Sequence, residues 1–409
     1  GYGISHDYIA YGNFESNIFT NPPFNSSISI GTGTSGGNTV YIPMDNPGSA
    51  VPSISALPRN LRIVGLPFNT PYVEQWSLDV QQEIAKGMIV DVGYFGASAH
   101  HLSGFIDLNQ PPVGAYATQL GMAAPITSSG QSQRLNAIRP FLGYGAISDF
   151  VNIFGSNYSA LQASLQRVWK DGSLVKVNYT WSHNLGDVDP TTGVGYSTST
   201  NFGASHTTAQ DRYNTSLEYG PTSLDRRQVF SADFVLIEPW FKAQHGLLGH
   251  VAGGWELSGI TTVNSGLALT PRANPFGALS TSDWPGLGCI GVSGCISMPN
   301  QIADPNAGAA HTITQWFNTS AFVPNASVAP GNAARGSVIG PGFWRQDLSL
   351  FKNMSLTERF KAQLRAEAFN VFNHTNLNTV DMRFGLASFG TVTSSRDPRI
   401  LQFAVKLMF

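Results

Sequence analysis

Charged side chains are scarce in this chain of 409 residues, since Asp, Glu, Lys and Arg together make up only 12% of it. Soluble domains of ordinary composition carry about 25%. So few charges cover a water-exposed surface poorly, whereas a surface that faces lipid needs almost none. The formal net charge of −2 gives no electrostatic reason to expect a nucleic-acid partner. Composition therefore favours a membrane protein over a soluble one.

Long apolar runs are missing as well. No stretch reaches the roughly 18 apolar residues that a transmembrane helix needs, and the mean hydropathy is near zero. A chain can also cross a bilayer as a closed β-barrel, whose signal is alternation of apolar and polar residues. The first residue is Gly1, and no charged-then-apolar leader follows it. We therefore expect either a processed chain or a fragment.

Cysteine is nearly absent, with two residues in the whole chain. Cys289 and Cys295 lie close together in a glycine-rich stretch. Two cysteines at this spacing can form a small disulfide loop in an oxidising compartment. We predict that disulfide, with two free thiols as the alternative. Too few ligands lie nearby for a metal site, and the sequence predicts no cofactor.

What the chain does have is alternation with period two, which predicts about ten β-strands. The last of them is 399–409, in which every second residue from Leu401 to Phe409 is apolar. The strands are expected near residues 1–10, 75–81, 88–95, 161–166, 175–182, 230–236, 255–264, 348–350, 360–368 and 399–409.

Short and long connections between these strands alternate strictly. Short links are expected at 84–87, 169–173 and 354–358, and a longer one at 239–250 lies on the same side. The long connections are rich in Gly, Pro, Ser, Thr and Asn and cover 11–71, 97–156, 187–225, 267–343 and 373–397. This two-sided asymmetry is typical of an outer-membrane barrel, which has short periplasmic turns and longer external loops.

The two faces of the expected strands differ in polarity. Charged residues fall on one face, which we expect to line a wet lumen: Lys176, Glu256, Arg365, Glu367 and Lys406. The other face carries almost no charge, and Trp76, Trp181 and Phe409 near strand ends fit an interfacial girdle. A soluble sandwich also alternates, but loops this long are unusual in one. The predicted fold class is all-β: an antiparallel up-and-down transmembrane β-barrel with long external loops.

The chain ends on the most apolar part of its last strand, without a polar tail. Phe403, Val405, Leu407 and Phe409 share one face of that strand. A terminal strand of this kind resembles the sorting signal that the outer-membrane barrel assembly machinery reads. We therefore expect that machinery and outer-membrane lipid as partners. The alternative is an edge strand of a soluble protein.

Several stretches carry a family resemblance. These are "PYVEQWSLDVQQEIAKGMIVDVGYFGASAHHL" (71–102) with "NQPP" (109–112), "NYSALQASLQRVWKDGSLVKVNYTWSHNLG" (157–186), "AGGWELSGITTVNSGLALT" (252–270) and "RQDLSLFKNMSLTERFKAQLRAEAFNVFNHTN" (345–376). Together they resemble TonB-dependent transporters of the Oar-like group. The resemblance implies residence in the outer membrane of a Gram-negative-type bacterium, and a barrel of about 22 strands.

On this resemblance, residues 1–409 form the C-terminal part of one barrel domain. Members of the group also have a signal peptide, a TonB box and a plug domain, and none of these is among the 409 residues. The resemblance thus implies an energy-coupling partner of the TonB type that acts through regions outside this sequence. It implies a transporter that captures an unknown small ligand with external loops and passes it through the lumen.

Two other functions remain open, a stand-alone porin-like or structural barrel and a soluble all-β enzyme or binding protein. We do not expect an enzyme. Gly33 to Gly37 match the G-x-S-x-G pattern, but they lie in a Gly- and Ser-rich loop without the strand and helix that a nucleophile elbow needs.

Four aromatic residues in and beside the loops could contact a ligand: Trp284, Trp316, Phe317 and Trp344. Packing of the loops onto one another is the preferred interpretation of these side chains. If a ligand is bound, we expect it at the long loops 187–225 and 267–343, because long loops on a rigid scaffold usually carry binding.

Overall fold

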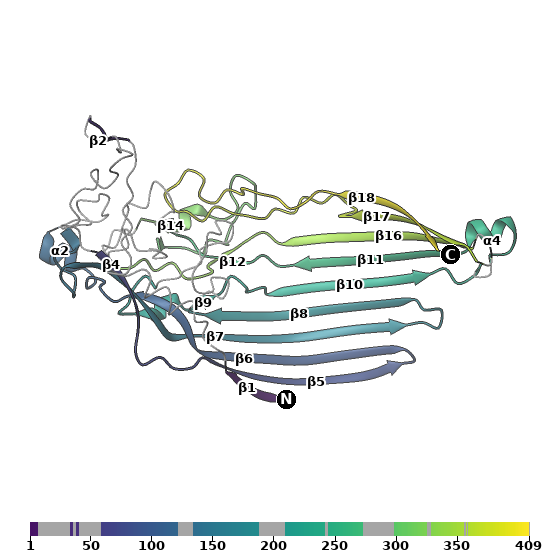
Figure 1. Ribbon diagram of the computed structural model, residues 1–409, viewed down its shortest axis with the longest axis horizontal. Helices are drawn as coiled ribbons and strands as arrows, with labels where there is room; N and C mark the ends of the chain where they lie inside the picture. Colours follow the sequence, from purple (N-terminus) through teal and green to yellow (C-terminus); the bar gives the residue numbers. More distant parts are fainter. Residues whose placement is uncertain are drawn as a thin grey trace, which may run out of the picture.

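A single antiparallel sheet dominates the computed structural model of the chain (Figure 1). The structure describes residues 1–6, 33–35, 38–40, 59–121, 134–187, 209–241, 244–272, 298–324, 329–355, 357 and 359–408. The main path through the sheet runs β1-β5-β6-β7-β8-β10-β11-β16-β17-β18, which is also the order along the chain. This up-and-down arrangement confirms the predicted fold class.

Each of these strands overlaps a predicted position, and several are longer than predicted. They are β1 (Tyr2–His6), β5 (Tyr72–Ala85), β6 (Met88–Asp107), β7 (Tyr144–Val168), β8 (Leu174–Gly186), β10 (Gln228–Ile237), β11 (Trp255–Asn264), β16 (Phe343–Ser355), β17 (Lys361–Phe369) and β18 (Ile400–Met408). Most reach the 9–11 residues that a transmembrane strand needs. Strands β1 and β18 stand at opposite edges of the sheet, so the sheet in the described residues is open.

The predicted asymmetry between the two ends of the sheet is confirmed. In Figure 1 the short links lie at the right and the long connections at the left. The turn after β5 closes at Gly87, whose φ of 71° favours glycine. In the turn after β7, the Asp171 carboxylate accepts a hydrogen bond from the backbone N–H of Ser173 at 3.0 Å. Such Asp-Gly turns join adjacent antiparallel strands, and Gly172 here has a φ of 95°.

The pairing register puts the five charged residues predicted to line the lumen, Lys176, Glu256, Arg365, Glu367 and Lys406, on one face. Lys176 of β8 lies opposite Asp233 of β10, and Gln363 of β17 lies opposite Lys406 of β18. On the other face Leu364 lies opposite Val405. Because side chains alternate across a strand, one face of the sheet is mainly polar and the other mainly apolar.

Among the described residues, most of the apolar face has no protein cover. Phe403 is 77% exposed, and Val405 and Leu407 are exposed to a similar degree. A contiguous apolar surface of this size is far larger than soluble monomers tolerate. In a barrel, the same surface faces the lipid chains.

A short helix covers one charge on the apolar face at the turn end. Helix α4 (Gly246–Ala252) lies in the link between β10 and β11. The Lys352 ammonium of β16 donates hydrogen bonds to the carbonyls of Val251 and Gly253, and it lies 4.9 Å from the Trp255 ring centre. The helix thus supplies acceptors to a lysine that lipid could not solvate. No helix among the described residues is long and apolar enough to cross a membrane.

Strands β6 and β7 are longer than predicted. Residues 97–156 were expected to form a loop, but β6 continues to Asp107 and β7 begins at Tyr144. Their outer halves form an extension beyond the neighbouring strands, with β4 (Arg59–Val64) pairing with β7 in parallel. The extension is covered on both sides, since the adjacent residues Ala146 and Ile147 are both buried. The loop prediction was therefore wrong over residues 97–107 and 144–156.

Polar side chains close the tip of the extension. The Asp107 carboxylate accepts hydrogen bonds from the backbone N–H groups of Asn109 and Ile147 and forms an ion pair with Arg139 at 3.1 Å. The fully buried Asn109 amide donates to the carbonyl of Gly145 at 2.7 Å. Helix α2 (Ala115–Leu120) follows at the tip. These buried polar groups are paired with one another, and the pairing stabilises this end of the extension.

The external loops after β11 and β17 pack on each other to form what we call the loop platform, described residues 265–272, 298–324, 329–342 and 370–396. Its short elements are β12 (Ala268–Leu269), β13 (Asn300–Gln301), η4 (Thr319–Ala321), β14 (Phe322–Val323) and β15 (Val338–Ile339). Its core consists of Leu269, Met298, Phe317, Ala321, Phe322, Ala333, Val338, Val380 and Met382. Further short elements outside the platform are β2 (Gly33–Ser35), β3 (Asn38–Val40), η3 (Thr215–Glu218) and β9 (Gly220–Pro221). The sheet therefore carries a packed cap at its loop end.

Candidate functional site at the external mouth

Three arginines that are far apart in the sequence meet at the external end of the sheet. Arg226 lies just before β10, Arg345 lies in the first residues of β16, and Arg396 lies just before β18. Arg345 is opposite Thr262, and Thr262 is opposite Ser231, which places Arg345 on the polar face. The three strands all start at the same end, so their arginines gather at the mouth of the lumen.

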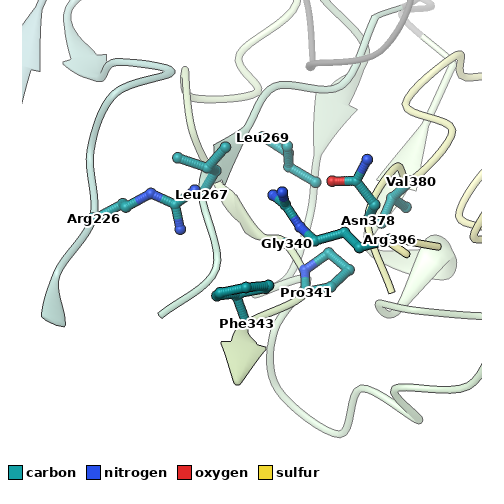
Figure 2. Close-up of a pocket in the computed structure, with 10 residues that line it drawn as sticks. Arg226, Leu267, Leu269, Gly340, Pro341, Phe343, Asn378, Val380 and Arg396 are labelled. Atoms are coloured by element: carbon teal, nitrogen blue, oxygen red, sulfur yellow. The ribbon is translucent and has the colours of Figure 1, made fainter. Parts of the chain in front are cut away.

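Figure 2 shows the cavity that two of these arginines line, with Arg226 and Arg396 extending toward each other from opposite sides. The Arg396 guanidinium lies 5.0 Å from the centre of the Phe343 ring. Arg226 and Arg396 both line a small cavity of about 20 Å³ beside Leu267 and Pro341. We call this cavity and its larger neighbour the arginine recess.

The larger cavity has a volume of about 260 Å³. It is lined by Phe343, Arg345, Asn376, Arg396 and Asp397. Phe343 and Arg396 line both cavities, so the two spaces adjoin. The recess thus combines an aromatic surface with several hydrogen-bond donors, which is the usual make-up of a small-molecule site.

Asparagine 376 fixes the segment that carries Arg396. Its side-chain carbonyl accepts from the backbone N–H of Trp344 at 2.8 Å, and its amide donates to the Trp344 carbonyl at 2.8 Å. The backbone N–H of Arg396 in turn donates to the Asn376 carbonyl at 2.8 Å. These bonds hold the loop before β18 against the first residues of β16. The backbone of Arg396 is therefore anchored to a strand of the sheet.

The charges in the recess are unevenly paired. Arg345 forms an ion pair with Asp347 at 2.6 Å, whereas Arg226, among the described residues, donates to a neutral group, the Ser265 carbonyl, at 3.0 Å. Burial, and then the positive charge of Arg396, lowers the pKa of Arg226. An arginine side chain nevertheless stays protonated in proteins. Two guanidinium groups therefore face one cavity without a described carboxylate paired to either.

Comparison with protein families settles the class of this molecule. A family model described as an outer membrane beta barrel domain matches residues 1–402. The chain belongs to this outer-membrane β-barrel family. It accordingly resides in the bacterial outer membrane, as predicted. No curated protein matches the chain.

Solved structures similar to this barrel-family chain include several outer-membrane proteins. The outer membrane transporter YddB from Escherichia coli is 10% identical, with a TM-score of 0.41, over 87% of this chain and 35% of that one. The FrpB iron transporter from Neisseria meningitidis is 10% identical, with a TM-score of 0.38, over 85% and 33%. The siderophore receptor PirA from Acinetobacter baumannii is 8% identical, with a TM-score of 0.36, over 83% and 32%. The barrel-family chain spans about a third of the length of these structures.

The aromatic residues singled out in the sequence lie in different environments. Phe317 is 1% exposed in the core of the loop platform, so it packs loops together and does not face a ligand. Trp316 packs against the same core and donates its indole N–H to the Ile339 carbonyl at 2.9 Å. Trp344 lies opposite Val263 on the apolar face and stacks on Phe372. All three side chains make packing contacts, and contact of Trp316 or Trp344 with a ligand stays a prediction.

Some of the predicted sites fall where the structure gives no description. Trp284, Cys289 and Cys295 lie outside the described residues, and so does Phe409. The disulfide therefore stays a prediction. The assembly signal also stays a prediction, although Phe403, Val405 and Leu407 lie on the lipid-facing side of β18. The G-x-S-x-G segment begins on β2 of a small β2–β3 hairpin.

Sequence reasoning missed the three arginines of the recess. They belong to three different segments of the chain, two connections and the start of β16, and share no motif. The available signal was weak: each arginine lies beside the external start of an alternating strand. A search for charged residues at the external ends of the predicted strands would have selected them.

Stability of the loop platform in acid depends on Asp381, which lies between β17 and β18. Burial by itself raises the pKa of this carboxyl, but hydrogen bonds from the Arg383 guanidinium at 2.9 and 2.6 Å and from the Ser388 hydroxyl at 2.7 Å outweigh burial. They hold the pKa of Asp381 below its ordinary value. A carboxyl with a lowered pKa stabilises the fold above the unfolded-state pKa, and that stabilisation is lost as the pH falls through the folded-state pKa.

We therefore expect the melting temperature of the platform to fall as the pH drops below about 4. The substitution Asp381→Asn should flatten this dependence while lowering the melting temperature at neutral pH. Near-UV circular dichroism during thermal melts between pH 7 and pH 2 measures both effects. Asp304→Asn, at an exposed position in the same platform, is the control. A wild-type pH dependence in the Asp381 variant contradicts the assignment.

Proposed function

We propose that this chain is the barrel part of an outer-membrane transporter of the TonB-dependent type. In this proposal a ligand is captured at the external mouth and passes along the polar face of the sheet into the periplasm. The observation that carries the proposal is the arginine recess. It lies at the loop end of the sheet, where the polar face begins. The resemblance of residues 71–102, 157–186, 252–270 and 345–376 to the Oar-like group supports it.

The same proposal makes residues 1–409 the C-terminal part of a larger barrel domain. Strands β1 and β18 present unpaired edges in the described sheet. Open strand edges are not tolerated in lipid, because their backbone groups have no partner there. Further strands that pair with both edges would close the barrel. A barrel of about 22 strands has a lumen wide enough to need a plug, the part through which a TonB-type protein would act.

Depletion of compounds from the growth medium tests the proposal while the ligand is still unidentified. Mass spectrometry of spent medium compares the wild-type strain, a deletion of the gene that encodes this chain, and a strain without its TonB-type coupling protein. We expect some low-mass compounds to disappear only when both the gene and the coupling protein are present.

The other outcomes separate the alternatives. Depletion that needs the gene but not the coupling protein indicates a porin-like pore. Equal depletion by all three strains overturns transport. Because the assay follows many compounds at once, it also returns the identity of the ligand.

A further inference from the structure

We propose that the arginine recess binds small polyanions, meaning ligands that carry two or more carboxylate or phosphate groups. This inference rests on the proposed function, since it names the ligand class that the external mouth accepts. Arg226 and Arg396 are the side chains that we assign to anion binding, and Phe343 forms the apolar floor between them.

The arrangement of charge in the recess is the first argument. Two guanidinium groups that point toward each other repel, and the repulsion grows as water is excluded. An anion placed between them converts this repulsion into two attractions. Guanidinium groups also match carboxylate and phosphate oxygens in geometry, because each can donate two parallel hydrogen bonds.

The second argument is that Arg226 and Arg396 differ in their ion pairing from the arginines that have a structural role in this molecule. Arg335 pairs with Glu218 at 3.2 Å and Arg139 with Asp107 at 3.1 Å, and all four side chains are almost fully buried. The Arg396 side chain is exposed, and its guanidinium contacts the face of Phe343. Among the described residues no carboxylate forms an ion pair with Arg226 or Arg396. These two arginines therefore lack the pairing that accompanies a structural role here.

The size and lining of the recess set the class of anion. A cavity of about 260 Å³ lies just below the range of drug-sized ligand sites, so it suits a small organic acid or a pyrophosphate. Asp397 also lines this cavity and disfavours anions on its side. The arginines outnumber it, and Arg345 is already neutralised by Asp347. Arg396 lines this larger cavity, whereas Arg226 lines only the adjoining cavity of about 20 Å³. A ligand in the larger cavity therefore needs a second anionic group, extended toward the smaller one, to reach both unpaired arginines.

Isothermal titration calorimetry on the full natural protein, purified in detergent from outer membranes, tests this inference. The probes are citrate, inorganic pyrophosphate and citramide, the uncharged triamide of the citrate skeleton. We expect at least one of the two anions to bind, binding to weaken as salt is raised, and citramide not to bind. Tighter binding of citrate assigns the site to polycarboxylates, and tighter binding of pyrophosphate assigns it to phosphate compounds.

Three variants complete the test. Arg396→Gln and the double variant Arg226→Gln with Arg396→Gln should weaken anion binding by about 10-fold and about 100-fold, as expected for lost charged hydrogen bonds. Arg396→Gln keeps the hydrogen bond from Arg226 to the Ser265 carbonyl, so it leaves the local fold intact. Arg167→Gln, at the turn end of β7, is the matched control and should bind as the wild type does.

Unchanged affinity in the double variant, equal binding of citramide, or no binding of either anion overturns the inference. These results are separate from the medium-depletion assay. Anion binding without gene-dependent depletion counts against transport and leaves the assignment of the recess intact. Depletion that persists in the double variant counts against the recess as the ligand site and leaves transport intact.

Discussion

Replacing Arg335 by methionine is expected to destabilise the external loops by about 3–5 kcal/mol, the largest effect of any single substitution considered for this chain. Arg335 and Glu218 form an ion pair at 3.2 Å, and each side chain is 2% exposed. The Glu218 carboxylate also accepts from the backbone N–H of Gln210 at 2.9 Å. Without Arg335, the carboxylate stays buried and loses the cation that compensates its charge, which is the reason for the large penalty.

The pair also joins two loops that are far apart in the sequence. Glu218 belongs to the loop between β8 and β10, and Arg335 belongs to the loop platform. Gly220 touches the same arginine, since a Cβ at that position would lie 2.8 Å from the Arg335 carbonyl oxygen. Loss of the pair should therefore detach the first loop from the platform while the membrane strands stay folded.

Limited proteolysis of intact cells measures this detachment, because the protease reaches only external loops. The Arg335→Met variant should be cut faster than the wild type within residues 209–221. A double variant, Arg335→Met with Glu218→Leu, should regain much of the resistance, since it removes the buried charge as well. Cleavage of Arg335→Met at the wild-type rate rules out the structural role of the pair.

Replacing Phe403 by lysine is expected to reduce the amount of folded protein in the outer membrane severely. Phe403 lies in the middle of β18 on the lipid-facing side, opposite Ala366 of β17. A lysine in the centre of the apolar band of a barrel costs about 2–4 kcal/mol. The penalty falls on the strand that also carries the predicted assembly signal, so insertion and stability should both decline.

Gln402→Lys is the matched control, because it adds the same charge one residue away on the polar face. Gln402 lies opposite Glu367, which provides an opposite charge for the new lysine. Semi-native electrophoresis of outer-membrane fractions, with and without heating, measures the folded fraction of each variant. Equal folded fractions for the two lysine variants contradict the assignment of faces to β18.

The strands in the membrane could be read from the sequence, and β18 shows why. It was predicted at 399–409 and runs from Ile400 to Met408. Lipid lies on one side of such a strand and water on the other, so the polarity of each residue predicts the face on which it lies. The register follows from the same signal, because a slip by one residue would exchange the two faces.

The extension of β6 and β7 was missed because that signal ends at the membrane surface. Beyond it both faces are covered by protein, and neighbours such as Ala146 and Ile147 are buried together. Register shifts interrupt the pairing between Ala99 and Gly104, which disturbs any remaining alternation. Buried polar residues, including Asp107 and Asn109, resemble loop residues until their partners are known.

The arginine recess could not be predicted for a different reason. Arg226, Arg345 and Arg396 come together only because β10, β16 and β18 start at one end of the sheet and the intervening loops fold back over it. No local sequence pattern predicts this meeting, since the three arginines share neither a motif nor a regular spacing. The packing of Phe317 was easier to expect, because a large aromatic residue in a long loop is most stable when it is buried.

Strand β7 has 25 residues, enough to extend about 80 Å. The apolar band of an outer-membrane barrel is only about 25 Å tall, and strands cross it at a tilt of about 40°. The outer half of β7, together with β6, therefore stands roughly 30 Å clear of the lipid. A phage tail fibre or an antibody that approaches the cell meets this projecting ridge before it meets the bilayer. Substitutions on the ridge can change such encounters without touching the strands that hold the protein in the membrane.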